Sequence, residues 1–185
     1  MVDINRFLEI DRRLDTVIRF GAKTRIKDES VAEHSFHTSL YAMIMADIEE
    51  MYGNKVDKEK LLKTAILHDL EEAMTGDIIY SFKHGDTNVA KEIKRFSSDF
   101  FKNIVCNLPD KLSKEYTDLW ENSKDTSTIE GRIIEAADKL EGLLYSMREV
   151  SLGNKSFENV VAAYIKQLKT MKLKSVEMIL EKLKI

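Results

Sequence analysis

The sequence predicts an all-α protein of about seven helices, and three observations support this. Glycine and proline are scarce, with 7 Gly and 1 Pro in 185 residues, whereas strands joined by tight turns use both. Apolar residues recur at helical spacing along most of the chain. The chain contains no convincing run of alternating apolar and polar residues, which is the pattern of a half-buried strand.

The first third of the chain predicts two helices separated by a loop. Residues 3–20 carry apolar side chains at helical spacing, and residues 21–29 show no period and read as a loop. Ser30 is a suitable N-cap, and Glu33 three residues later completes a capping-box pattern. The helix that starts there should run to about Met51.

The middle of the chain predicts a helix, a break and a surface loop. Asp57 could cap a helix over about 58–73, which Thr75-Gly76-Asp77 would end. Residues 78–86 read as the loop that follows.

The second half predicts four more helices. The first covers about 87–106, and the second starts at Pro109 and reaches Trp120. A long helix spans about 128–150, and Ser156 opens a last helix that runs to the C-terminus.

Composition and charge limit the classes of function. Hydrophobic residues make up 43% of the chain, and 29 Lys+Arg nearly balance 32 Asp+Glu, for a net charge of −3. This balance argues against disorder and against a nucleic-acid polymer as partner, since such binders are usually strongly basic. No stretch of 18 apolar residues exists to span a membrane, and the N-terminus lacks the apolar run of a secretory signal. Cys106 is the only cysteine, which excludes an intramolecular disulfide and favours the cytoplasm.

Four residues stand out as candidate metal ligands because they place polar groups where a helical core should be apolar. His34 lies near a helix start and shares a face with His37, His68-Asp69 ends an apolar helix, and Asp138 lies midway along another. Each alone is most simply a hydrogen-bonded or solvent-facing side chain, and His37 is more simply a neighbour of the site than a fifth ligand. Together, two imidazoles and two carboxylates suit Mn, Co, Fe, Zn or Mg.

Two motifs carry a resemblance to a known family. The order His34 … His68-Asp69 … Asp138 resembles the H…HD…D signature of the HD-domain metal-dependent phosphohydrolases. The segment from Glu29 to His34, Glu-Ser-Val-Ala-Glu-His, resembles the YfbR-like 5′-deoxynucleotidase branch of that superfamily. So does His-Asp-Leu-Glu-Glu-Ala-Met-Thr-Gly-Asp, from His68 to Asp77. The likeness extends from about residue 19 to residue 154.

The resemblance implies a fold and a metal site. It implies a single HD domain over residues 1–185, with a metal-binding core of about 19–154 and a C-terminal helix, 156–185, docked on that core. It also implies one divalent metal ion, bound by the four ligands that match the family: His34, His68, Asp69 and Asp138.

The resemblance also assigns catalytic and substrate roles. Glu72 matches the acid that orients or deprotonates the attacking water, and Asp77 matches a second acid, either a proton donor or a sugar-binding residue. Arg19, Phe20 and Lys83 fall where the family binds substrate. The simpler structural alternatives are that Arg19 only pairs with Asp15, that Glu72 is a surface carboxylate and that Asp77 is a loop or cap residue.

Two departures from the pattern affect the substrate pocket. Phe20 replaces a frequent Trp, and Ile-Ile-Tyr-Ser at 78–81 replaces a Leu-Pro-Thr-Pro segment. They leave the preference for sugar and base open and do not touch the metal ligands.

The resemblance implies that the protein is a metal-dependent phosphomonoesterase that releases phosphate from (deoxy)nucleoside 5′-monophosphates, and we expect it in the cytoplasm. The resemblance further implies a homodimer. One alternative is another HD-type phosphohydrolase that acts on a cyclic nucleotide, a nucleoside triphosphate or (p)ppGpp. A non-catalytic nucleotide-binding HD module is the alternative from a different class.

Overall fold

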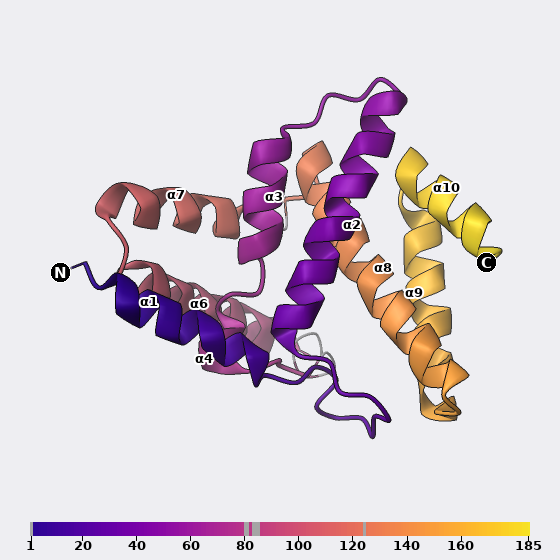
Figure 1. Ribbon diagram of the computed structural model, residues 1–185, viewed down its shortest axis with the longest axis horizontal. Coiled ribbons are helices and arrows are strands. Elements are labelled where there is room, and N and C mark those ends of the chain that lie inside the picture. Colours follow the sequence, from indigo (N-terminus) through magenta and orange to yellow (C-terminus); the bar gives the residue numbers. More distant parts are fainter. Residues whose placement is uncertain (1, 80–81, 83–85, 124) are drawn as a thin grey trace.

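Helices account for nearly all regular structure in the computed structural model, which describes residues 2–79, 82, 86–123 and 125–185 (Figure 1). Within these residues the β-structure is limited to one isolated bridge, between Ile18 and Ser30, so the predicted all-α class is confirmed. The α-helices are α1 (Ile4–Asp11), α2 (Val31–Met51), α3 (Lys58–Leu67), α4 (Glu72–Thr75), α6 (Thr87–Val105), α7 (Asp110–Glu121), α8 (Ile129–Ser151), α9 (Glu158–Thr170) and α10 (Lys174–Leu183). Two short 3₁₀ turns are η1 (Arg12–Asp15) and η2 (Lys155–Phe157).

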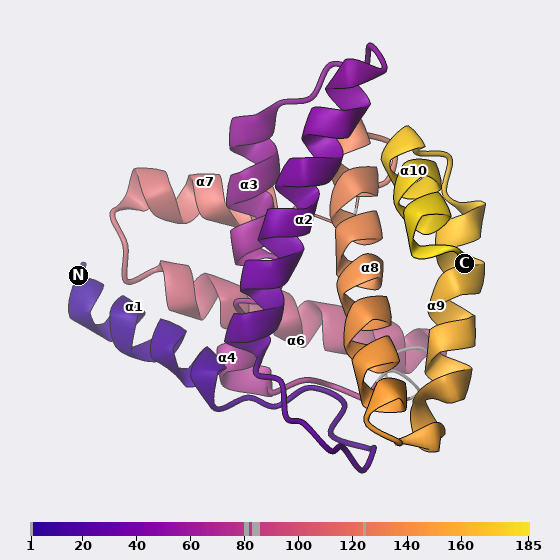
Figure 2. The same cartoon turned by 45° about the vertical axis from the view of Figure 1, so that its right-hand side comes forward.

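Helices α2 and α8 form the centre of the larger core. They pack along each other, with α3 on one side and α9 and α10 on the other (Figure 2). Met45 of α2, Leu61 of α3 and Leu143 of α8 meet in this core with no exposed surface. Burying side chains of this size stabilises the fold by about 1.5–3 kcal/mol each.

A second core lies beside the N-terminal end of α2 and the C-terminal end of α3. Helices α1, α4, α6 and α7 enclose it, and Phe101 stacks on Trp120 with ring centroids 4.8 Å apart. The indole N–H of Trp120 donates to Glu71 Oε2 at 2.8 Å. The two cores meet where α2 begins and α3 ends.

Several predicted helix starts are confirmed. Ser30 and Glu33 form a capping box, in which the hydroxyl of Ser30 accepts the N–H of Glu33 and the Glu33 carboxylate accepts the N–H of Ser30. Asp57 caps α3 by accepting the N–H of Lys60, and α7 follows Pro109.

The predicted helix over residues 3–20 is too long. Helical structure ends with η1 at Asp15, and the chain continues without helical structure as far as Ser30. There Arg19 donates its N–H to the carbonyl of Glu29, and Val31 donates to the carbonyl of Val17. Pairing with a distant segment has replaced the helical bonds that the local pattern favoured.

The predicted helix over 58–73 breaks at His68. Helix α3 ends at Leu67, and the next bonds are tight ones from the N–H of Leu70 to Leu67 and from Glu72 to Asp69. The ring of His68 bonds the carbonyl of Ala65 at 2.7 Å. The tighter turn brings the consecutive residues His68 and Asp69 to one site.

The predicted helix over 156–185 is two helices. Helix α9 ends at Thr170 and α10 begins at Lys174, although neither glycine nor proline lies between them. Ser175 gives the reason, because its N–H and hydroxyl both donate at 2.7 Å to the buried Glu49 of α2. A carboxylate at a helix N-terminus is favourable, so α2 fixes where α10 starts.

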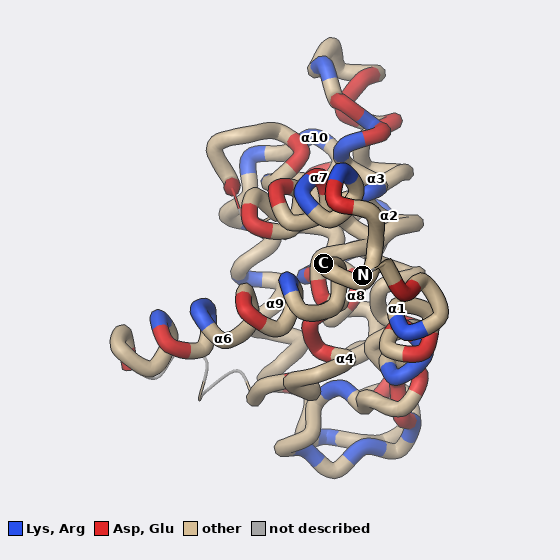
Figure 3. Tube along the Cα trace, turned by 90° about the vertical axis from the view of Figure 1, so that its left-hand side faces the viewer, with Lys and Arg blue, Asp and Glu red and all other residues tan. Residues whose placement is uncertain are grey.

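Acidic and basic residues are interspersed along the trace, as the near-balanced composition implies (Figure 3). In the described part of the chain, no helix has the length and apolar content needed to cross a membrane.

Candidate active site

The sequence-predicted ligands meet where the two cores join. His34 comes from the first turns of α2, His68 and Asp69 from the end of α3, and Asp138 from the middle of α8. His34 Nε2 lies 3.4 Å from Asp69 Oδ2 and 3.4 Å from Asp138 Oδ1. His68 Nε2 lies 3.0 Å from Asp69 Oδ2 and 3.3 Å from His34 Nε2. The bundle thus gathers all four residues.

Both imidazoles are oriented by a bond on the far side of the ring. His34 Nδ1 lies 2.7 Å from Glu141 Oε2, and His68 Nδ1 lies 2.7 Å from the carbonyl oxygen of Ala65. When each Nδ1 carries the proton, both Nε2 atoms point lone pairs into the same space. Two nitrogen ligands at about 2.1 Å from one ion lie about 3.0–3.4 Å apart, so the observed spacing fits a shared divalent cation.

The electrostatics of the cluster favour a positive charge. Burial favours the neutral acid of Asp69, but the charge and hydrogen bonds of His68 and His34 lower its pKa well below the usual range. Burial likewise opposes ionisation of Asp138, and His34 lowers the pKa of that carboxyl. Burial also disfavours the imidazolium of His34, yet hydrogen bonds to the surrounding carboxylates raise its pKa well above normal. A divalent ion supplies the same positive charge.

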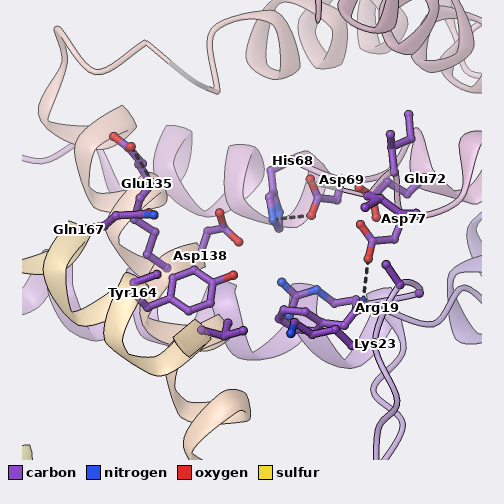
Figure 4. A pocket seen from close by; sticks show the side chains of 18 of the residues that line it. Arg19, Lys23, His68, Asp69, Glu72, Asp77, Glu135, Asp138, Tyr164 and Gln167 are labelled. Atoms are coloured by element: carbon purple, nitrogen blue, oxygen red, sulfur yellow. Dashed lines mark hydrogen bonds and ion pairs between the residues drawn. The ribbon is translucent and has the colours of Figure 1, made fainter. Parts of the chain in front are cut away.

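A cavity of about 810 Å³ opens over the cluster (Figure 4). Its volume is within the range of small-molecule sites. His68, Asp69 and Asp138 line it, while His34 lies fully buried beneath. The predicted catalytic acids Glu72 and Asp77 also line it. Glu72 is the first residue of α4, about one turn beyond His68 and Asp69. The structure therefore brings both predicted acids to the cavity that the predicted ligands line.

Arg19 lines the cavity in an ion-paired state. Its Nη1 donates to Glu29 Oε2 at 2.8 Å and to Glu141 Oε2 at 2.5 Å. The alternative pairing with Asp15 is wrong, because Asp15 pairs with Arg12. Burial opposes the charge of Arg19, but Glu141 and the other nearby acids raise its pKa. The guanidinium is held at the cavity wall as a permanent cation.

Phe20 also lines the cavity, in a backbone conformation rare for a residue with a side chain. Its φ is 56°, and its N–H donates to Asp77 Oδ2 at 2.9 Å. Its ring stacks on Tyr145, with centroids 5.1 Å apart and planes 9° apart, and meets the edge of Phe157. The residue therefore connects the loop 19–29 to α8 and to the segment before α9.

His37 and Lys83 have different outcomes. The ring of His37 stacks on Tyr41, with centroids 6.1 Å apart, and meets the ring of Phe36 edge-on. Its ring therefore packs against neighbours on its own helix, and its place as a neighbour of the site stays a prediction. The predicted substrate residue Lys83 lies outside the described residues.

Sequence reasoning missed two side chains that shape the site. Glu141 is buried and bonds both His34 and Arg19; its position one helical turn after Asp138 was the available signal. Tyr164 of α9 points its hydroxyl into the cavity between Asp138 and Arg19 (Figure 4). Burial raises its pKa to about 12, so it is a neutral donor. No local motif marked Tyr164, because α9 reaches the site only through packing on α8.

Comparisons with known proteins show which family and fold this chain is similar to. A family model described as 5′-deoxynucleotidase YfbR-like matches residues 6–184. A 5′-deoxynucleotidase of Photorhabdus laumondii is 30% identical over 157 residues, which are 84% of this chain and 79% of that protein. A 5′-deoxynucleotidase of Mus musculus is 31% identical over 153 residues, 81% and 71% of the two chains. The crystal structure of an HD-domain phosphohydrolase from Listeria innocua superposes with a TM-score of 0.87 at 26% identity, covering 97% of this chain and 87% of that one.

Proposed function

Because the chain belongs to the YfbR-like 5′-deoxynucleotidase family, we propose that it releases phosphate from deoxynucleoside 5′-monophosphates with one divalent ion. His34, His68, Asp69 and Asp138 are the ligands of that ion. The observation that carries this proposal is the convergence of two imidazole Nε2 atoms 3.3 Å apart with the two carboxylates, at the floor of a cavity. When bound, the ion supplies positive charge for the phosphate oxygens and activates water.

Glu72 and Asp77 divide the remaining acid–base and binding roles. Glu72 is 6% exposed and lines the cavity beside His68 and Asp69, which supports a role for its carboxylate in taking the proton of the attacking water. Asp77 uses one carboxylate oxygen to accept the N–H of Phe20. Its other oxygen is available to a sugar hydroxyl, and sugar binding is the role we assign to it.

Arg19 and Phe20 bind the substrate from the loop side of the cavity. Both ion pairs of Arg19 use Nη1, and a guanidinium carries five N–H donors, so donors remain for a phosphate oxygen. The ring of Phe20 supplies an apolar wall next to that arginine. Lys83 is assigned to substrate binding on its motif position alone.

The substrate class is tested by phosphate release from a panel of deoxy- and ribonucleoside 5′-monophosphates. Metal-stripped protein is assayed alone and with Mn, Co, Mg or Zn. The expected result is release that requires an added ion and favours the deoxy series. Release from a cyclic nucleotide, a triphosphate or (p)ppGpp, and from no monophosphate, would overturn the proposed substrate.

The ligand set is tested by replacing Asp69 and Asp138 with Asn. A metal contributes several kcal/mol of transition-state stabilisation, so release should fall by about 100-fold or more, together with loss of bound ion. Asp118→Asn, on the exposed face of α7, is the matched control and should retain full activity. Full activity in Asp69→Asn would remove that residue from the metal site.

The exposed face of α2 supports a homodimer. Phe36, Leu40, Met43, Ile44 and Met51 are all exposed on that one face, where a monomer would place polar groups. The neighbouring carboxylates are satisfied within the chain, since residues 47 and 50 both pair with Lys58 at 2.7 Å. An apolar stripe without unpaired charge suits packing on its own copy around a two-fold axis.

Light scattering tests the dimer, with Met43→Lys and Met51→Lys as the disrupting pair. The double variant should have the mass of a monomer while the parent has twice that mass. Leu152→Lys, at an equally exposed apolar position after α8, is the control and should not change the mass. A parent protein with the mass of a monomer overturns the proposed dimer.

We assign the enzyme to the cytoplasm because its one cysteine, Cys106, is free and exposed. The whole chain is proposed as one HD domain, in which α9 and α10 dock on the metal-binding core.

A further inference from the structure

One carboxylate oxygen connects the metal cluster to the substrate side of the cavity. Glu141 Oε2 lies 2.7 Å from His34 Nδ1 and accepts from Arg19 Nη1 at 2.5 Å. The residue is 3% exposed and lies on α8, one turn after Asp138. A buried carboxylate is costly unless it is paired, and here both partners belong to the proposed site.

The other possible partner of the His34 Nδ1 proton is weaker than Glu141, and the other acid that pairs with Arg19 makes no bond to His34 within the described residues. Thr38 Oγ1 lies 3.4 Å from His34 Nδ1, beyond the range of a strong hydrogen bond. Glu29 contacts Arg19 at 2.8 Å, yet it makes no hydrogen bond to His34 within the described residues. Glu141 is therefore the strong acceptor for the Nδ1 proton of His34.

We propose that Glu141 is a positioning residue for the metal site: it fixes the proton on His34 Nδ1, so that Nε2 presents its lone pair to the ion, and it holds Arg19 at the cavity wall through the same oxygen. This inference rests on the proposed function only in taking His34 as a metal ligand. A carboxylate behind a ligating imidazole sets its tautomer, orients its ring and raises its basicity, and losing such a partner typically weakens metal binding about 10–100-fold.

The test measures binding of Co²⁺ to metal-stripped protein without nucleotide, followed by visible absorption. Glu141→Ala should bind Co²⁺ about 10–100-fold more weakly than the parent, with an altered absorption spectrum. Glu141→Gln keeps a neutral acceptor and should recover most of the affinity. In the metal-free parent, at a pH above the raised pKa of His34, ¹⁵N NMR should find the remaining ring proton on Nδ1, and in neutral His34 of Glu141→Ala it should find a mixture of tautomers.

Glu149→Gln is the matched control. Glu149 lies on the same helix, is fully buried and accepts the N–H groups of Ile26 and Lys27 from the same loop, but it makes no contact with His34 within the described residues. Its substitution should lower stability and leave Co²⁺ affinity unchanged. Equal losses of affinity in the Glu141→Ala and Glu149→Gln proteins would reduce Glu141 to a structural role.

Two further outcomes are informative. If circular dichroism shows that Glu141→Ala does not fold, Glu141→Met is tested in its place, because the methionine side chain fills about the same volume as glutamate. A folded Met variant with parental Co²⁺ affinity and a parental His34 tautomer overturns the proposal. If the parent binds Co²⁺ in a Glu141-dependent manner yet hydrolyses no monophosphate, the positioning role stands and the proposed substrate fails.

Discussion

Gly142 leaves the space that the ring of Tyr164 occupies, and adding one methyl group there should change the cavity. A Cβ at position 142 would lie 2.6 Å from Cζ, 2.6 Å from the hydroxyl oxygen and 2.9 Å from Cε2 of Tyr164. Carbon atoms in contact normally lie about 3.5–4.0 Å apart. In Gly142→Ala the ring must therefore withdraw by roughly 1 Å, and its tip lies between Asp138 and Arg19 (Figure 4).

The expected loss of stability is small because two effects oppose each other. Overpacking costs about 1–3 kcal/mol, and Ala is about 1 kcal/mol better than Gly inside a helix. The net loss is about 0–2 kcal/mol, or up to about 8 °C in Tm for a chain of this size. The effect on substrate binding should be easy to measure, since a displaced hydroxyl that loses about 1.4 kcal/mol of contact with the substrate raises KM about tenfold.

Thermal unfolding and steady-state phosphate release measure the two effects. Adding Tyr164→Ala to Gly142→Ala removes the clash, so the double variant should be more stable than the sum of the single changes by about 0.5–3 kcal/mol. Gly131→Ala is the control, because its Cβ would overlap the backbone carbonyl of Asp125 at 2.0 Å, in the first turn of α8. It should lose stability at unchanged KM. A Gly142→Ala protein with a raised Tm and parental KM would refute the packing argument.

Three further results are expected. Thr64→Val should raise stability by about 1 kcal/mol in urea unfolding, because the buried hydroxyl of Thr64 has no hydrogen-bond partner among the described residues. Burial opposes ionisation of Glu149, but hydrogen bonds from the backbone N–H of Ile26 and from the side chain of Asn154 lower the pKa of its carboxyl below the ordinary 4.5. The stability that this carboxylate contributes is therefore present above pH 4.5 and is lost as the pH falls through the lowered pKa. The Tm advantage of the parent over Glu149→Gln should accordingly shrink below pH 4.5. An added divalent ion at 100 times its Kd should stabilise the parent by about 2.7 kcal/mol, and Asp69→Asn should abolish this gain in a thermal shift assay.

Local signals in the sequence predicted those parts of the fold that local bonds decide. The capping box at Ser30 and the helix start after Pro109 depend on neighbours within four residues, and both are confirmed. The break before α10 was missed because its cause is Glu49, which is 126 residues away from Ser175 in the sequence. No composition or period near residue 172 could have indicated it.

The candidate site divides in the same way. His34, His68, Asp69 and Asp138 were predicted because polar residues interrupt apolar helices and match a motif, and the structure brings them together. The ion pairs of Arg19 with Glu29 and Glu141 could not be predicted, since they depend on how the loop folds against α8. Periodicity assigns a residue to a face of a helix, and the partner on the opposite element is decided by packing.

The loop 19–29 has little regular structure of its own, yet it is fastened mainly to the second half of α8 and the residues just after it. Lys27 donates its N–H to Glu149, and its carbonyl accepts the hydroxyl of Tyr145, while the side chain of Asn154 donates to the carbonyl of Thr24. Surface loops usually open at little cost in free energy. This one can detach only when the end of α8 gives up its side-chain contacts, so its amides should exchange hydrogen together with those of α8, as one cooperative unit.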